Sequence, residues 1–180
     1  VSHWDGEPDM NSASLGIELD HDGHDNNGRM AAFPDLQMRA LYALLQTLCD
    51  RHAIAPENVL GHSDIAPGRK IDPGEAFDWA ALNKAGFGLW LTGVTPEDVP
   101  PLAEGSADKA VMHLQKALAA FGYHIAADGH YGPQTAAVIS AFQRHFRPAQ
   151  IDGMADAETQ TLIYAYCRAV LKALSERREV

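Results

Sequence analysis

The sequence has few cysteines, no long hydrophobic run and a deficit of positive charge, and each of these excludes a class of protein. Its two cysteines, Cys49 and Cys167, are far apart and form neither a Cys-x-x-Cys motif nor a disulfide framework, so we expect two buried thiols. No apolar stretch approaches the length needed to cross a bilayer. The chain has 14 Lys and Arg residues against 24 Asp and Glu residues, and this net charge of −10 disfavours a broad nucleic-acid-binding face.

The 180 residues divide at a segment that has no hydrophobic period. Residues 92–105 belong to the stretch TGVTPEDVPPLAEGSAD, which is rich in proline, glycine and acidic residues and is typical of a linker. The sequence therefore predicts one domain over residues 1–91 and a second domain over residues 106–178.

Residues 1–91 carry the periodicities of an α/β domain. In SLGIELD, residues 14–20, apolar residues alternate with Gly and Glu, which predicts a strand. Leucines at helical spacing from Pro34 to near His52 predict a helix, and Pro34 suits its first turn. NVLGH, residues 58–62, indicates a short buried strand. Strand, helix and strand form an α/β arrangement, in which functional groups commonly lie where the strands end.

Residues 106–178 carry the pattern of three amphipathic helices. Apolar residues recur at helical spacing in DKAVMHLQKALAAFGY, GPQTAAVISAFQRHF and DAETQTLIYAYCRAVLKAL. Asp128-Gly129 and Asp152-Gly153 are each followed by a threonine in a D-G-x5-T repeat with a period of 24 residues. Asp-Gly favours a bend, and each threonine lies near the start of the next helix. The pattern predicts a small all-α domain in which three helices close one core.

The stretch GHSDIAPGRKIDPGEAFDW is polar and contains two Pro-Gly turns. His62 and Asp72 could both reach one ion if the loop between them folds back, and a zinc hydrolase needs two or three such ligands and an open position for water. Lys70 could then stabilise an oxyanion, and Glu18 could take the proton from the attacking water. On the residues alone, a surface ion pair of Lys70 with a neighbouring aspartate, or a solvated loop, explains the same spacing.

This stretch resembles the signature of the zinc-dependent N-acetylmuramoyl-L-alanine amidases of the type-2 family, which are related to peptidoglycan recognition proteins. NSASLGIELD and PENVLGHSDIAP are similar to two further motifs of that family, so the resemblance runs from about residue 1 to residue 90. It implies that His62 and Asp72 bind Zn²⁺, that Lys70 is catalytic and that Glu18 acts on the zinc-bound water. It also implies a mixed central sheet flanked by helices, and hydrolysis of the amide between N-acetylmuramic acid and L-alanine.

Residues 106–175 resemble the small three-helix peptidoglycan-binding domain through LQKALAAFGYHIAADGHYGPQTAAVISAFQ. An amidase joined to this module implies peptidoglycan or muropeptides as partners, no nucleic acid, and a place in the periplasm or cell envelope. Tethering would raise the effective concentration of the catalytic site at an insoluble substrate. Two alternatives stay open: a non-catalytic peptidoglycan-binding protein, and a cytosolic recycling amidase, which would leave residues 106–175 without a role.

One ligand of the family's zinc site has no counterpart in this sequence. The family's first zinc histidine lies upstream of the GIEL strand, whereas His3 falls outside the matching position. His21 and His24 follow that strand, and a solvated loop is the default interpretation for them. The resemblance therefore implies a further histidine upstream of Val1, in a segment that is present in the folded molecule. We expect this segment to be either a second polypeptide cleaved from the same precursor or part of a partner chain. A signal or lipid anchor is expected in that segment too.

Overall fold

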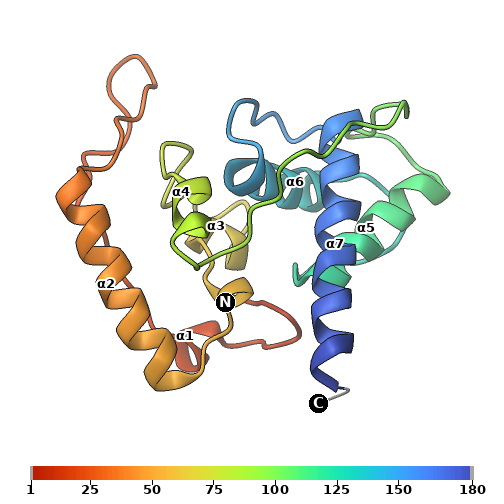
Figure 1. Cartoon of the computed structure of the whole chain (residues 1–180). Helices are drawn as coiled ribbons and strands as arrows, with labels where there is room; N and C mark the ends of the chain where they lie inside the picture. Colours follow the sequence, from red (N-terminus) through yellow and green to blue (C-terminus); the bar gives the residue numbers. More distant parts are fainter. Residues whose placement is uncertain (1, 179–180) are drawn as a thin grey trace.

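The computed structural model describes residues 2–178, apart from the side chains of residues 173, 174, 177 and 178, and this part of the chain is mainly helical (Figure 1). The helices in chain order are α1 (Met10–Ala13), α2 (Asp35–His52), η1 (Pro56–Asn58), α3 (His62–Ile65), α4 (Trp79–Lys84), α5 (Lys109–Phe121), α6 (Pro133–Phe146) and α7 (Ala157–Arg178). Figure 1 shows α2 on one side, α5 and α7 on the other, and the short helices α3 and α4 between them.

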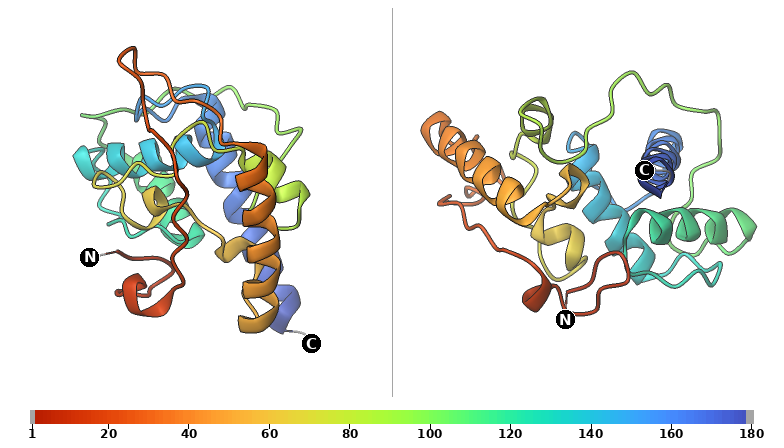
Figure 2. Two further views of the ribbon diagram at one scale, coloured as in Figure 1. Left: turned by 90° about the vertical axis from the view of Figure 1, so that its left-hand side faces the viewer. Right: turned by 60° about the horizontal axis from the view of Figure 1, so that its bottom comes forward.

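The predicted mixed central sheet is wrong for residues 2–178, which form isolated bridges but no β-strand. Residues 14–20 run as an elongated coil (Figure 2), in which Ile17 and Leu19 are half-buried and Glu18 is exposed, whereas Leu15 is exposed, so the alternation of faces holds only over residues 17–19. A strand also needs a neighbouring segment that supplies ladder hydrogen bonds, and this coil forms no such ladder. The second predicted strand, residues 58–62, is also wrong, because residues 59–61 form a coil between the end of η1 and the start of α3 at His62.

The helix predicted in the first part is confirmed as α2. It begins at Asp35, directly after Pro34, and ends before Ala53, whose φ of 52° is left-handed. Its buried side chains are part of a hydrophobic cluster, called here the α2–α4 cluster, that comprises Leu41, Leu45, Phe77, Trp79, Leu82 and Phe87. This cluster joins α2 to the end of the polar motif and to α4.

The three helices predicted in the second part are confirmed as α5, α6 and α7. Their most completely buried apolar side chains, with exposed fractions of 1% or less, are Val111, Leu114, Leu118, Val138, Ile139, Ala141, Phe142, Ile163 and Tyr166. Trp4, near the N-terminus, also belongs to this core and contacts the rings of Phe121 and Tyr123 edge-on at centroid distances of 5.7 and 5.0 Å. The core of the three helices therefore includes a side chain from the first part of the chain.

Residues 92–105, the predicted linker, lie along the helical region rather than spanning open solvent. Leu102 and Ala155 exchange two backbone hydrogen bonds of 2.9 and 2.8 Å. The backbone N–H of Glu97 donates to the Thr161 hydroxyl at 2.9 Å, and the Gln160 amide donates to the carbonyl of Pro100 at 2.8 Å. These bonds hold the segment against the start of α7.

The D-G-x5-T repeat corresponds to two turns that are built in the same way around a buried glutamine, which the sequence analysis missed. In each turn the glutamine amide donates to the aspartate carboxylate, to a backbone carbonyl and to the threonine hydroxyl, and its oxygen accepts the glycine N–H. The two sets are Gln115 with Asp128, Gly129, His130 and Thr135, and Gln143 with Asp152, Gly153, Met154 and Thr159. The two glycines have φ of 79° and 71°, a conformation that favours glycine.

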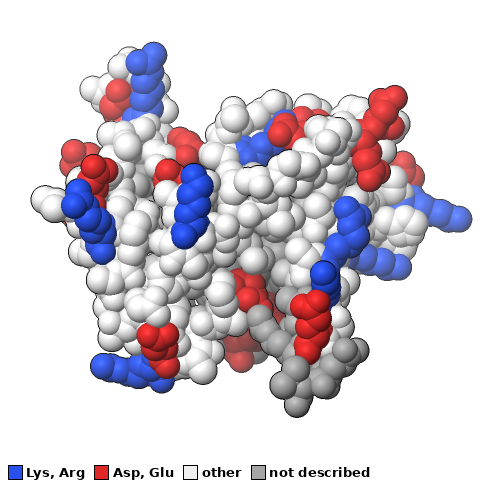
Figure 3. Space-filling model, in the orientation of Figure 1, with Lys and Arg blue, Asp and Glu red and all other residues white. Residues whose placement is uncertain are grey.

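The charged side chains are mixed rather than segregated on the face shown in Figure 3. There, Lys and Arg lie among Asp and Glu, and a broad uncharged area occupies much of the centre. Within the described part of the chain, no helix is both long and apolar enough to span a membrane.

Replacing Gln143 with alanine should lower the free energy of unfolding by about 2–4 kcal/mol, because several buried groups lose their partner at once. Gln143 is fully buried and makes five hydrogen bonds with its turn. Gln134→Ala, in the first turn of the same helix and exposed, is the matched control and should change stability by less than about 0.5 kcal/mol. Urea denaturation of both variants measures the difference, and equal midpoints would contradict the structural role of the buried glutamine.

Candidate active site

His62 and Asp72 meet at the start of α3. His62 Nδ1 lies 2.8 Å from Asp72 Oδ2, and the backbone N–H of Ser63 donates to the carbonyl of Asp72 at 2.9 Å. The loop between the two residues folds back through Pro67-Gly68, and Gly68 has a φ of 72°. The Pro-Gly turn thus brings the two ends of the motif together, as predicted from the sequence.

The His62–Asp72 pair has the chemical character of part of a zinc site. An imidazole nitrogen and a carboxylate oxygen are donors that zinc accepts. Their side chains are 37% and 58% exposed, so the pair is open to solvent on one side. The two donor atoms already lie next to each other in the folded chain. The residues therefore fit two positions of a zinc centre, although within residues 2–178 no group of three or more His, Cys, Asp or Glu side chains is arranged to hold a metal.

Lys70 and Glu18 are placed differently from this pair. Lys70 is half-buried in the loop that ends at Asp72, and its backbone N–H donates to the carbonyl of Ala66. Glu18 is exposed on the elongated segment 14–20. No hydrogen bond or ion pair among the described residues joins either side chain to His62 or Asp72. The structure thus brings together two of the four predicted site residues.

The histidines of the loop after Glu18 bind protein groups. His21 Nε2 lies 2.8 Å from the carbonyl oxygen of Ala31, and His24 Nε2 lies 2.6 Å from Glu75 Oε1. Burial acts to raise the pKa of Glu75. The hydrogen bond from His24 and smaller contributions together exceed this effect, so the pKa of Glu75 is lowered. Because Glu75 follows Asp72 by three residues, the His24–Glu75 pair fixes loop 21–30 against the end of the motif.

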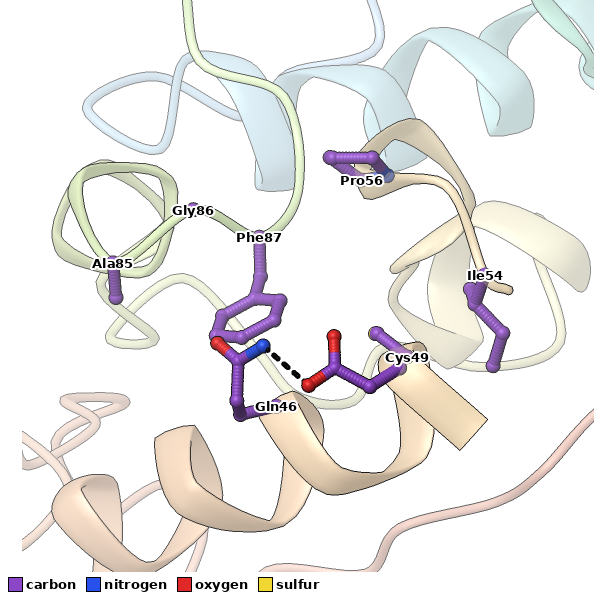
Figure 4. A pocket seen from close by; sticks show the side chains of 8 residues that line it. Gln46, Cys49, Ile54, Pro56, Ala85, Gly86 and Phe87 are labelled. Carbon is purple, nitrogen blue, oxygen red and sulfur yellow. Dashed lines mark hydrogen bonds between the residues drawn. The ribbon is translucent and has the colours of Figure 1, made fainter. Parts of the chain in front are cut away.

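A shallow pocket of about 200 Å³ lies between the end of α2 and the loop after α4 (Figure 4). Its lining residues, none of which belongs to the motif, are Gln46, Cys49, Asp50, Ile54, Pro56, Ala85, Gly86 and Phe87. Burial, and then the charge of Asp50, raises the pKa of the Cys49 thiol. A raised pKa disfavours the thiolate, which is the nucleophilic form of cysteine.

Comparison with known proteins finds a matching family for each of two regions of the chain. Residues 2–75 match the family described as N-acetylmuramoyl-L-alanine amidase, and residues 107–163 match a peptidoglycan-binding domain family. The chain is 38% identical over 177 residues to the N-acetylmuramoyl-L-alanine amidase AmiD of Escherichia coli K12, which covers 92% of this chain and 60% of AmiD. It is 45% identical over 83 residues to the 1,6-anhydro-N-acetylmuramyl-L-alanine amidase AmpD of Enterobacter cloacae, which covers 46% of this chain and 41% of AmpD.

Solved structures give the same relationship. AmiD from E. coli, in complex with the substrate anhydro-N-acetylmuramic acid-L-Ala-D-gamma-Glu-L-Lys, matches with a TM-score of 0.76 at 35% identity, over 94% of this chain and 66% of AmiD. AmpDh3 from Pseudomonas aeruginosa matches with a TM-score of 0.75 at 32% identity, over 94% of this chain and 67% of AmpDh3.

The chain therefore belongs to the N-acetylmuramoyl-L-alanine amidase family. Its similarity to AmiD extends over both matched regions, so it resembles a family member in which an amidase region is followed by a peptidoglycan-binding region. The chain spans 60% of the length of AmiD and 41% of the length of E. cloacae AmpD.

Replacing Glu75 with alanine should release loop 21–30 from the motif, because it removes the acceptor of His24. We expect trypsin to cleave after Arg29 at least several-fold faster than in the unmodified protein, since faster local opening exposes the backbone to protease. Glu104→Ala is the control, because Glu104 is exposed and lies in the distant segment 92–105. Equal cleavage rates in all three proteins, measured by mass spectrometry, would show that the His24–Glu75 pair does not hold the loop.

Proposed function

We propose that the full-length protein is a zinc-dependent N-acetylmuramoyl-L-alanine amidase that hydrolyses the amide bond between N-acetylmuramic acid and L-alanine in peptidoglycan or muropeptides. The observation that carries this proposal is the 2.8 Å contact between His62 and Asp72, within the segment that matches the amidase family. Two relatives support it by name, since AmiD and AmpD are both amidases of muramyl-L-alanine compounds. The muropeptide bound to AmiD supports the substrate class.

In this proposal His62 and Asp72 hold the zinc ion. When bound, the ion supplies Lewis acidity and lowers the pKa of a coordinated water molecule. Hydrolytic zinc centres generally have three protein ligands, and the third ligand here, a histidine by family resemblance, remains a prediction. The folded-back loop of the motif keeps its two donors adjacent before any ion arrives, which reduces the entropy lost on binding.

Lys70 and Glu18 are proposed to assist the reaction of the substrate amide. The Lys70 ammonium would stabilise negative charge that develops on the carbonyl oxygen as water adds to the carbonyl carbon. Glu18 would accept a proton from the water and pass it to the amide nitrogen as the C–N bond breaks. The products are a lactyl carboxylate on the sugar and a free α-amine on the L-alanyl peptide.

The second region gives the proposed enzyme a place to act. Residues 107–163 match a peptidoglycan-binding family, and a protein that is held on the wall meets a high local concentration of its substrate. The cell envelope, and the periplasm within it, is therefore the proposed location.

Glu18→Ala and Lys70→Ala should each lower the rate of stem-peptide release by about two to four orders of magnitude, the usual cost of losing a general base or an oxyanion stabiliser. Mass spectrometry of an anhydromuropeptide digested by the full-length protein measures the release. Glu104→Ala and Lys84→Ala, both at exposed positions outside the motif, should digest at the wild-type rate. Wild-type digestion by the Glu18 and Lys70 variants would remove their assigned roles, and a wild-type protein that binds muropeptide but releases nothing would indicate the non-catalytic alternative.

His62→Ala and Asp72→Ala should each weaken zinc binding by more than about 100-fold. Loss of an outer-shell partner costs up to about 100-fold in metal affinity, and loss of a direct ligand should cost more. Competition with a chromophoric chelator measures this affinity in the full-length protein without any substrate. His113→Ala, an exposed histidine on α5, is the control and should bind zinc as the wild type does. Unchanged affinity in both ligand variants would place the metal elsewhere.

A further inference from the structure

Asp64 is a carboxylate that is almost completely buried next to the candidate site. Its exposed fraction is 1%, and it lies in α3, two residues after His62. Asp64 Oδ2 accepts the backbone N–H of Gly61 at 2.8 Å and lies 2.7 Å from His145 Nδ1. Asp64 Oδ1 accepts the hydroxyl of Tyr123 at 2.8 Å. We call these four residues the Asp64 cluster.

Within α3 the Asp64 carboxylate fixes the turn that presents His62. Gly61 is the residue before the helix, and its N–H is one of the groups that a helix leaves without an internal partner. The space around Gly61 is also tight, because a Cβ added to Gly61 would lie 3.0 Å from Pro73 Cδ and 3.2 Å from Asp64 Oδ2. The position of His62 relative to Asp72 therefore depends on where Asp64 is held.

The two side chains that hold Asp64 come from the peptidoglycan-binding region. Tyr123 follows α5 and His145 lies in α6, and both are 2% exposed. Burial, reinforced by the Asp64 charge, raises the pKa of Tyr123 well above its ordinary value, so the phenol stays a donor. The His145 ring stacks on Trp79 at a centroid distance of 3.6 Å and on Phe146 at 3.8 Å, which fixes the direction of Nδ1.

We propose that Tyr123 and His145 are positioning residues for the amidase site, acting through Asp64 on the turn that carries His62. In this arrangement the peptidoglycan-binding region is a structural part of the hydrolytic site as well as a wall anchor. The proposal rests on the proposed function for its catalytic consequence, whereas the geometric link from Tyr123 and His145 to His62 is independent of it. Without its donors Asp64 would be an uncompensated buried charge, and the turn would shift to expose it.

The experiment uses variants of the full-length protein that lack either the Tyr123 hydroxyl or the His145 hydrogen-bond donor. Tyr123→Phe removes only the hydroxyl that Asp64 accepts. Tyr131→Phe is the matched control, because Tyr131 is also 2% exposed and its hydroxyl donates to the carbonyl of Gly153, remote from α3. His145→Leu removes the donor to Asp64, and His145→Asn restores an N–H near the position of Nδ1, so their difference isolates the hydrogen bond from the ring stack.

Two readouts follow His62 directly. The first is the NMR resonances of the His62 imidazole together with amide hydrogen exchange at Gly61. We expect Tyr123→Phe and His145→Leu to shift the resonances of the His62 ring. We also expect both variants to increase the Gly61 exchange rate at least tenfold more than the exchange rates at Leu114 and Ile163, because exchange at these two buried positions reports global stability. The second is zinc affinity by chelator competition, which should fall about 10- to 100-fold in the same two variants and recover in His145→Asn.

The outcomes separate positioning from stability and from function. If Tyr123→Phe and Tyr131→Phe lower the free energy of unfolding alike and neither changes the His62 resonances or Gly61 exchange, the Asp64 cluster is only a contact between the two regions and the proposal is overturned. If the wild-type protein neither binds zinc nor digests muropeptide, the proposed function fails. In that case the His62 resonances and Gly61 exchange still decide whether Tyr123 and His145 position the turn.

Discussion

The burial of the Asp64 carboxylate is the constraint on which the centre of this molecule depends. A carboxylate with 1% exposure is tolerated only when donors surround it, and here the donors come from Gly61, Tyr123 and His145. Two of those donors lie more than fifty residues away along the chain, so the carboxylate requires both regions to be folded and in contact. The relative placement of α3 and α6 follows from this requirement.

The hydrophobic packing reinforces the same junction. Trp79 belongs to the α2–α4 cluster, yet its ring stacks on His145, whose neighbour Phe146 lies in the core of the three helices. Trp4 makes a second link, since it is buried against Phe121 and Tyr123. A boundary near residues 92–105 describes the order of the sequence motifs, but the cores on either side of it share contacts. Packed side chains therefore join the two regions in addition to the connecting segment.

The four long helices, α2, α5, α6 and α7, were predictable from the sequence because the periodicity that specifies them is local, whereas the short helices α1, α3 and α4 were not predicted. The spacing of leucines after Pro34 predicted α2, and the apolar periods after residue 106 predicted α5, α6 and α7. The mixed sheet was not predictable in this way. The alternation does leave Ile17 and Leu19 half-buried, but a strand is defined by its partner, and a partner is a property of the tertiary structure.

For the site, the sequence by itself determined the donor types and the turn that joins them. His62, Asp72 and the Pro-Gly turn lie within one short segment, so their meeting is a matter of local chain geometry. Membership of the amidase family was likewise contained in the order of the motif residues. Only the tertiary structure decided that Asp64 is buried and held by Tyr123 and His145, since no periodicity or spacing relates residues so distant in sequence. Burial and hydrogen bonding across the junction depend on how the two regions pack, and this packing fixes the position of the Asp64 side chain.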